Sequence, residues 1–366
     1  MPGKMIQIGI IGLGQSGKTT VFNALCSGHA NVGDFSVSKS PNIAVIKVPD
    51  KRLLRLADIF QAPKITYAEM EFIDVAGMTS GDSIDSFKEP AFITAIKMTS
   101  ELLAVIRCFE NANVPHPDGS VDPARDILAL ETELMISDLV LIEKRLEKVR
   151  HMLKVKPSPA GKAEMALLEK MKSQLESEKP LREMEFSKDE SGLISSFGFL
   201  SLKPILHLLN LGENQIGEGA LLERRYFPAT PKNRSHASLC GKIEMELATM
   251  LENERQEFLA ELGIDELAAG KVIKRSFQLL GLISFLTGGE KEARIWPVPN
   301  GINALEAAGE IHSDIQRGFI KAETITFGEL DSIGDWGEAR KHGKIRIEGK
   351  EYIIKDGDVI LFRFNV

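Results

Sequence analysis

Residues 12–19 carry the chemistry that is easiest to recognise in this chain, because they spell Gly-Leu-Gly-Gln-Ser-Gly-Lys-Thr. The two outer glycines allow a tight loop whose backbone N–H groups turn inward toward phosphate oxygens. Lys18 would place a positive charge on the β- and γ-phosphates of a nucleotide, and Thr19 would supply a hydroxyl to Mg²⁺. The pattern therefore predicts a P-loop that contacts phosphates through Gly12, Gly14, Gln15, Ser16, Gly17, Lys18, Thr19 and Thr20.

The setting of this loop supports that prediction, since the same letters also occur by chance in unrelated chains. An apolar strand is expected over 6–11, immediately before the loop, and a helical pattern covers 18–25. A helix that starts there directs its positive N-terminal end at the bound phosphates. The strand, loop and helix follow one another in the order that phosphate binding requires.

A second candidate is Asp74, which ends the strand-like run Glu-Phe-Ile-Asp and is followed by Val-Ala-Gly77. In an Asp-x-x-Gly pattern the carboxylate holds the Mg²⁺ shell and the glycine amide senses the γ-phosphate. Taken alone, Asp74 could be an ordinary turn residue at the end of a strand. Together with the P-loop the functional interpretation is favoured, and Lys18 and Gly77 become the candidate catalytic groups.

The nucleotide base has a candidate reader in Asn210-Leu-Gly-Glu213, which follows an apolar strand. Guanine-specific switches carry Asn-Lys-x-Asp at this place, where the Asp carboxylate accepts both guanine N–H groups. Here Leu211 replaces the lysine and Glu213 is one methylene longer. Loss of a charged hydrogen bond removes about 10- to 200-fold of preference, so we expect adenine to be accepted or preferred. Cys240 is assigned to the same site, and the alternative is that Asn210 only caps the next helix.

The elements around these motifs predict an α/β domain. Strand-like apolar runs at 44–48, 70–73, 102–106 and 205–209 alternate with helical patterns, which is typical of a mostly parallel sheet with helices on both faces. Another helical stretch covers 242–280, and the carboxylates from Glu244 to Glu261 are interpreted as its solvent-facing side. From about residue 281 short strands and turn residues predict a separate small α+β domain.

A helical hairpin is expected to interrupt this pattern over 122–182. Apolar residues at 135, 139, 142, 146, 149 and 153 are spaced as in the seam of a coiled coil, and prolines at 157 and 159 mark the turn. Basic side chains gather near that turn without an acidic neighbour. They are either a solvated hairpin end or candidate RNA contacts through phosphates, namely Lys148, Arg150, Lys154 and Lys156.

The bulk composition limits the remaining possibilities. The 366 residues predict two or three domains, and the net charge of −7 argues against nucleic-acid binding through overall charge. Three widely separated cysteines predict neither a zinc site nor a disulfide framework. The N-terminus does not resemble a signal peptide, and no apolar run reaches the length of a membrane span. We therefore expect a cytoplasmic protein without a membrane partner.

On these motifs the chain resembles the Obg-like ATPases, the YchF family of P-loop proteins, over essentially its whole length. The resemblance also rests on segments such as Arg107-Cys-Phe-Glu110, Lys291-Glu-Ala-Arg-Ile-Trp296 and 356–366. It implies a G-domain over 1–121 and 183–280, an inserted helical hairpin over 122–182, and a ubiquitin-like TGS domain over 281–366. It also implies binding of ATP as well as GTP and association with ribosomes or RNA. Separately, we expect a monomer.

Three positions bear on the rate of hydrolysis. Met78 stands where most related GTPases have a water-orienting glutamine, so slow turnover of roughly 10⁻⁴ to 10⁻² s⁻¹ is expected without a partner. The switch-I threonine of the family, a further metal ligand, falls on Ser38. The segment after Gly77 keeps only Gly81 and is acidic, whereas the family has a glycine-rich switch there. These departures are what a diverged paralogue would show.

The leading hypothesis is thus a slow Mg²⁺-dependent ATPase and GTPase that acts as a ribosome- or RNA-associated switch. Its rival is a nucleotide-binding adaptor without significant hydrolysis, and a small-molecule kinase is a third interpretation. The histidines His116, His207 and His312 are isolated in the sequence, and His207 is interpreted as a core residue. A second basic cluster around Lys341 and Arg346 faces either RNA or solvent.

Overall fold

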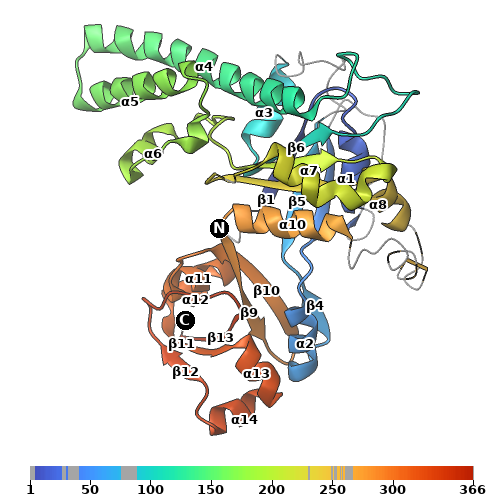
Figure 1. Cartoon of the computed structure of the whole chain (residues 1–366). Helices are drawn as coiled ribbons and strands as arrows, with labels where there is room; N and C mark the ends of the chain where they lie inside the picture. The colour runs from blue at the N-terminus through green and yellow to red at the C-terminus, as the bar shows by residue number, and fades with distance from the viewer. Residues whose placement is uncertain are drawn as a thin grey trace. The chain divides into compact units, whose positions relative to one another are not determined.

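The computed structural model describes residues 5–26, 30–31, 41–75, 89–229, 231–248, 250, 254–255, 257, 259 and 267–365. The chain divides into two compact units, and Figure 1 labels their helices and strands where there is room. We call Gln7–Ala44 with Phe72–Arg275 the sheet-hairpin unit. The C-terminal unit consists of Met1–Ile6, Val45–Glu71 and Ser276–Val366.

The sheet-hairpin unit is built on a seven-stranded sheet of order β2-β3-β5-β1-β6-β7-β8. Strands β1, β6, β7 and β8 pair in parallel, and every residue of β6 and β7 is buried. Such fully buried, largely apolar strands are typical of a parallel sheet covered on both faces. The strands are β1 (Ile6–Ile11), β2 (Ala30–Asn31), β3 (Asn42–Lys47), β5 (Glu69–Asp74), β6 (Glu101–Arg107), β7 (Ile205–Asn210) and β8 (Arg234–Leu239).

Helices connect these strands and bury their apolar sides against the sheet. They are α1 (Lys18–Cys26), α3 (Pro90–Lys97), α7 (Gly219–Tyr226), α8 (Gly241–Ala248), α10 (Ala268–Leu279) and the short 3-10 helix η4 (Glu213–Glu218). The shared core includes Ile11, Phe92, Leu102, Leu130 and Leu209. The predicted α/β P-loop fold with a mostly parallel sheet is confirmed. The carboxyl ends of the parallel strands place the loops after β1, β6, β7 and β8 along one edge.

The predicted helical hairpin is present as α4 (Pro123–Val155) and α5 (Pro159–Glu176), which lie side by side in Figure 1. The seam residues Ile142, Leu146 and Val149 pack against Leu168 and Met171. Asp122 caps α4 by accepting a hydrogen bond from the Arg125 N–H, and Ser158 caps α5 in the same way. The chain returns to the sheet through η3 (Leu181–Glu183) and α6 (Lys188–Ile194).

The C-terminal unit has a six-stranded sheet of order β12-β11-β13-β9-β10-β4. Its core gathers Phe285, Ala307, Phe319 and Phe362. Beyond β4 (Lys64–Thr66) the strands are β9 (Leu282–Gly288), β10 (Glu292–Pro299), β11 (Phe319–Thr326), β12 (Arg346–Glu348) and β13 (Asp358–Phe364). The helices are α2 (Lys51–Phe60), α11 (Ala304–Ile311), α12 (Ser313–Arg317), α13 (Phe327–Ile333) and α14 (Trp336–Lys341).

Val45–Glu71 belongs to the C-terminal unit in the structure, whereas the sequence analysis expected it in the G-domain as part of 1–121. Strand β4 pairs in parallel with β10, and Lys64 forms an ion pair with Glu292 at 2.8 Å. From α2, Arg52 reaches Asp356 at 2.8 Å. A strand of three residues can pair with any open sheet edge, and its own sequence does not specify which edge it will join. This long-range pairing therefore lay beyond sequence reasoning.

No helix in the described part of the chain is long and apolar enough to cross a membrane.

Candidate nucleotide site

The P-loop runs from the end of β1 to the start of α1, as predicted. Gly12 and Gly17 have φ angles of +153° and +86°, a region in which side chains are strained. A Cβ atom at Gly12 would lie 2.5 Å from the Val105 carbonyl oxygen, and one at Gly17 would lie 2.3 Å from Asn210 Nδ2. Both positions therefore need glycine for two reasons, the backbone conformation and the close approach of a neighbour.

Two side-chain oxygens inside this loop are buried without a hydrogen-bond partner in the described structure. They are Ser16 Oγ and Gln15 Oε1, and Gln15 itself has a left-handed backbone with φ of +56°. The Lys18 ammonium lies within the same loop and donates to the carbonyl oxygens of Gly12 and Leu13 at 3.0 and 2.7 Å. Unsatisfied buried polar groups are rare in folded proteins, so their presence here is consistent with a ligand-binding loop.

The candidate metal residues meet beside the loop. Thr19 Oγ1 donates to Asp74 Oδ2 at 2.9 Å, and Asn42 Nδ2 lies 3.5 Å from the same carboxylate oxygen. Asp74 is fully buried at the end of β5. A hydroxyl beside a carboxylate is a hard-oxygen pair that suits a small divalent cation. The other predicted ligand, Ser38, and the predicted switch residues Gly77 and Met78 lie outside the described residues.

Asn210 occupies the junction between the P-loop and the base side of the site. Its buried amide donates from Nδ2 to the Ser16 carbonyl oxygen at 3.0 Å, and its Oδ1 accepts from the Gly241 N–H at 3.1 Å. These bonds join β7 to the P-loop and to the start of α8. Neither bond is made to the helix that follows β7, which Asn210 would cap in the alternative interpretation. The amide N–H of Gly212, beside that helix, is instead capped by the Gln215 side chain.

The other predicted base-site residues differ in exposure. Leu211 and Cys240 are buried in the core of the unit, where burial raises the pKa of the Cys240 thiol. Glu213 is exposed, and its carboxylate lies 2.5 Å from the Lys242 ammonium. Of Leu211, Cys240 and Glu213, only Glu213 therefore exposes a polar side-chain group to solvent. The backbone N–H of Leu211 donates to the Leu239 carbonyl oxygen at 2.8 Å, which ties the ends of β7 and β8 together.

Arg107 and Phe109 are residues of this site that the sequence reasoning did not assign a role. The Arg107 guanidinium is buried and donates to the carbonyl oxygens of Val114 at 2.6 Å and Phe109 at 3.1 Å. It also reaches the Gln15 carbonyl oxygen of the P-loop at 3.4 Å, and it stacks 4.5 Å above the Phe109 ring. An arginine that ends an otherwise apolar buried strand was the available signal.

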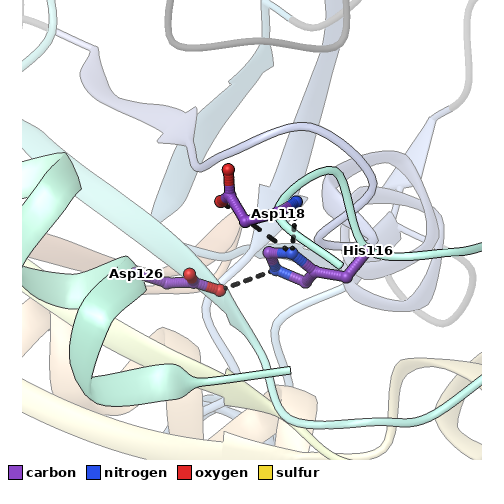
Figure 2. A group of neighbouring side chains, drawn as sticks. All are labelled: His116, Asp118 and Asp126. Carbon is purple, nitrogen blue, oxygen red and sulfur yellow. Dashed lines mark hydrogen bonds and ion pairs between the residues drawn. The ribbon is translucent and has the colours of Figure 1, made fainter. Parts of the chain in front are cut away.

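His116 was expected to be isolated, but Figure 2 shows it between Asp118 and Asp126. The Asp118 backbone N–H donates to His116 Nδ1 at 3.1 Å, so the ring proton resides on Nε2 and is donated to Asp126 Oδ2 at 3.0 Å. Arg125 donates to the other oxygen of Asp126 at 3.0 and 2.9 Å. A metal ion would have to displace these donors, so we interpret the group as a latch that fixes the loop after β6 to α4.

A buried charge network lies where the hairpin joins the sheet. Arg182 of η3 donates from one nitrogen to both carboxylate oxygens of Glu131 in α4, at 2.8 and 2.6 Å. His207 Nε2 of β7 lies 3.3 Å from Glu131, and Arg234 of β8 lies 3.8 Å away. Burial alone would raise the pKa of Glu131, but His207 and Arg182 outweigh it and hold the pKa at about 2. His207 is thus a buried residue, as expected, beside a carboxylate.

Glu244 was expected on the wet face of a helix, and the structure contradicts this. Its side chain is buried, and Oε2 accepts a hydrogen bond from the Ala269 N–H at 3.1 Å. The carboxylate thus caps the start of α10, which a helical periodicity cannot reveal. In the hairpin, the predicted RNA contacts Lys148, Arg150, Lys154 and Lys156 are all exposed, and Arg150 pairs with Glu169 at 3.2 Å.

Comparison with known proteins fits this geometry. A family model described as a 50S ribosome-binding GTPase matches residues 7–143. A second model, for the C-terminal region of YchF GTPases and described as a protein of unknown function, matches residues 282–365. The chain is 38% identical to the ribosome-binding ATPase YchF of Bacillus subtilis, over 98% of this chain and 99% of that protein.

The chain belongs to the YchF family. The YchF protein of Escherichia coli O157:H7 is also 38% identical, over 98% of this chain and 99% of its own length. The solved structure of the Schizosaccharomyces pombe YchF GTPase matches with a TM-score of 0.85 and 28% identity, and the match covers 99% of each chain. The family resemblance inferred from the sequence motifs is confirmed.

Proposed function

We propose that this chain is a ribosome-associated switch that binds ATP, accepts GTP, and slowly hydrolyses the bound nucleotide. The observation that carries the proposal is the contact between Thr19 and Asp74 at the end of a complete P-loop. The relatives in B. subtilis and E. coli are named ribosome-binding ATPases, which supports both the reaction and the partner. A monomer in the cytoplasm remains the simplest expectation.

Each part of the site has a role in this proposal. The backbone N–H groups of the P-loop and Lys18 bind the phosphates, and Thr19 and Asp74 hold Mg²⁺. The ion supplies positive charge that offsets the charge developing on the phosphate oxygens. Arg107 and Asn210 fix the loop from two sides, so it is preorganised for the phosphates rather than reshaped by them. Gly77 and Ser38 are proposed to sense the γ-phosphate.

The decisive experiment is single-turnover phosphate release from γ-labelled ATP with Mg²⁺. We expect release at roughly 10⁻⁴ to 10⁻² s⁻¹ in the wild type. In Asp74→Asn, the addition of Mg²⁺ should no longer stimulate phosphate release. Asp118→Asn is the matched control, because that carboxylate is exposed and lies outside the P-loop. Tight ATP binding with release no faster than in Asp74→Asn would instead support the adaptor hypothesis.

The hairpin end is proposed to contact ribosomal RNA phosphates, and this makes a separate prediction. Changing Lys148, Lys154 and Lys156 to alanine should weaken ribosome binding and flatten its dependence on salt. The slope of log affinity against log salt should become shallower by about 0.9 for each phosphate that the variant no longer neutralises. Lys179→Ala with Lys188→Ala is the control, because these exposed lysines lie at the other end of α5 and on α6. Equal slopes in the wild type and the triple variant would reject the hairpin end as the RNA-binding surface.

A further inference from the structure

Lys242 occupies a position that its own helix does not favour. It is the second residue of α8, and the N-terminal end of a helix carries partial positive charge that repels a lysine. Its ammonium lies 2.5 Å from Glu213 Oε1, and the two side chains are 63% and 52% exposed. The preceding residue, Gly241, donates its backbone N–H to Asn210. The pair therefore lies beside the amide that anchors the base side of the site.

We propose that Lys242 determines base selectivity by engaging the carboxylate of Glu213. The inference rests on the proposed function, and it names the residue that sets the preference between the two nucleotides. Guanine presents two N–H donors on one edge and needs a free, charged acceptor to bind them. Adenine has one amino group and a ring acceptor on that edge, and it gains much less from a carboxylate. The ion pair between Lys242 and Glu213 therefore weakens the recognition of guanine more than the recognition of adenine.

The size of the effect follows from the exposure of the pair. An ion pair between exposed side chains is weak, so guanine can displace the ammonium at the expense of a factor of at most about five in affinity. Lys242 would therefore shift the ratio of the two affinities rather than exclude GTP. Because solvent-exposed pairs are screened by salt, the same shift should appear in the wild type when ionic strength is raised.

The test is calorimetric measurement of ATP and GTP affinity, with Mg²⁺, in the full chain and four variants. Lys242→Met should raise the ratio of GTP to ATP affinity by about three- to fivefold, and Lys242→Arg should leave it near the wild-type value. Glu213→Gln and the double variant Glu213→Gln with Lys242→Met should share one ratio, because neither offers a carboxylate to guanine. Raising the salt concentration should increase the ratio in the wild type and leave it constant in Lys242→Met.

An unchanged ratio in Lys242→Met would overturn the inference while leaving the proposed function in place. A ratio that rises equally with and without Glu213 would overturn it as well. If the wild type bound neither nucleotide, the proposed function would fail first and this inference with it. Far-UV circular dichroism on each variant checks that the exposed substitutions leave the fold intact.

Discussion

Replacement of Glu131 by glutamine is expected to lower the free energy of unfolding of the sheet-hairpin unit by about 3–5 kcal/mol. The change removes the carboxylate that accepts two hydrogen bonds from Arg182, a side chain that is only 1% exposed. A buried ion pair adds little compared with apolar residues, but removal of one partner strands the other. The measurement is urea denaturation followed by far-UV circular dichroism, which reports the long helices α4 and α5.

Two internal controls make this result specific. Glu169→Gln removes an ion pair with Arg150 in the same hairpin whose side chains are about half exposed, and it should alter stability by about 0–1 kcal/mol. Both tryptophans, Trp296 and Trp336, belong to the C-terminal unit, so tryptophan fluorescence should report an unchanged transition there. Equal losses of unfolding free energy in the Glu131 and Glu169 variants would show that the buried network stabilises the fold no more than an exposed ion pair does.

The same pair predicts a pH dependence. The pKa of Glu131 is held at about 2 in the folded protein, below its ordinary value of 4.5. A depressed carboxyl pKa stabilises the fold fully above the ordinary value, and that stability is lost as the pH falls toward the folded value. The difference in unfolding free energy between wild type and Glu131→Gln should therefore be constant above about pH 4.5 and shrink toward pH 2.

Replacement of Asn210 by alanine is expected to lower the affinity for ATP and GTP alike, by about 10- to 200-fold. Its amide satisfies the Ser16 carbonyl oxygen and the Gly241 N–H, so its removal leaves a buried acceptor and a buried donor unpaired. The discriminating probe is inorganic tripolyphosphate, which has no base. If Asn210 holds the P-loop in shape, tripolyphosphate binding should fall together with nucleotide binding.

Glu213→Gln is the matched comparison for that experiment. Its exposed carboxylate pairs with Lys242 of α8, so the change should alter the balance between ATP and GTP and leave tripolyphosphate binding unaltered. Tripolyphosphate affinity that survived in Asn210→Ala would contradict the structural role and leave base reading as the sole role of Asn210. Calorimetry with Mg²⁺ measures all three ligands in the same way.

Local patterns were enough to predict much of this molecule. The largely apolar runs that became β6 and β7 predicted a covered parallel sheet, and the spacing from Met135 to Leu153 predicted the hairpin. In both cases the pattern and the burial concern the same short stretch of chain. The P-loop is predictable for the same reason, since strand, loop and helix are contiguous.

The features that escaped prediction depend on partners distant in the sequence. Glu131 meets Arg182 across 51 positions, and a glutamate in a helix looks the same whether it faces water or a buried arginine. Glu244 caps α10 by folding back over 25 positions. His116 finds Asp126 only ten residues away, but the intervening turn has no periodicity that would bring them together. Only the folded arrangement reveals such pairs.

Because Val45–Glu71 belongs to the C-terminal unit, the boundaries of that unit matter when it is transferred to another protein. Residues 282–365, the stretch that the YchF C-terminal model covers, contain neither α2 nor β4. Cut out alone, they would leave β10 as a bare strand edge, open to pairing with a second molecule. Phe60, which packs over Gly288, would also be missing. A transfer of this unit to another protein should therefore carry both pieces, and we expect the 282–365 fragment alone to associate through the open edge of β10.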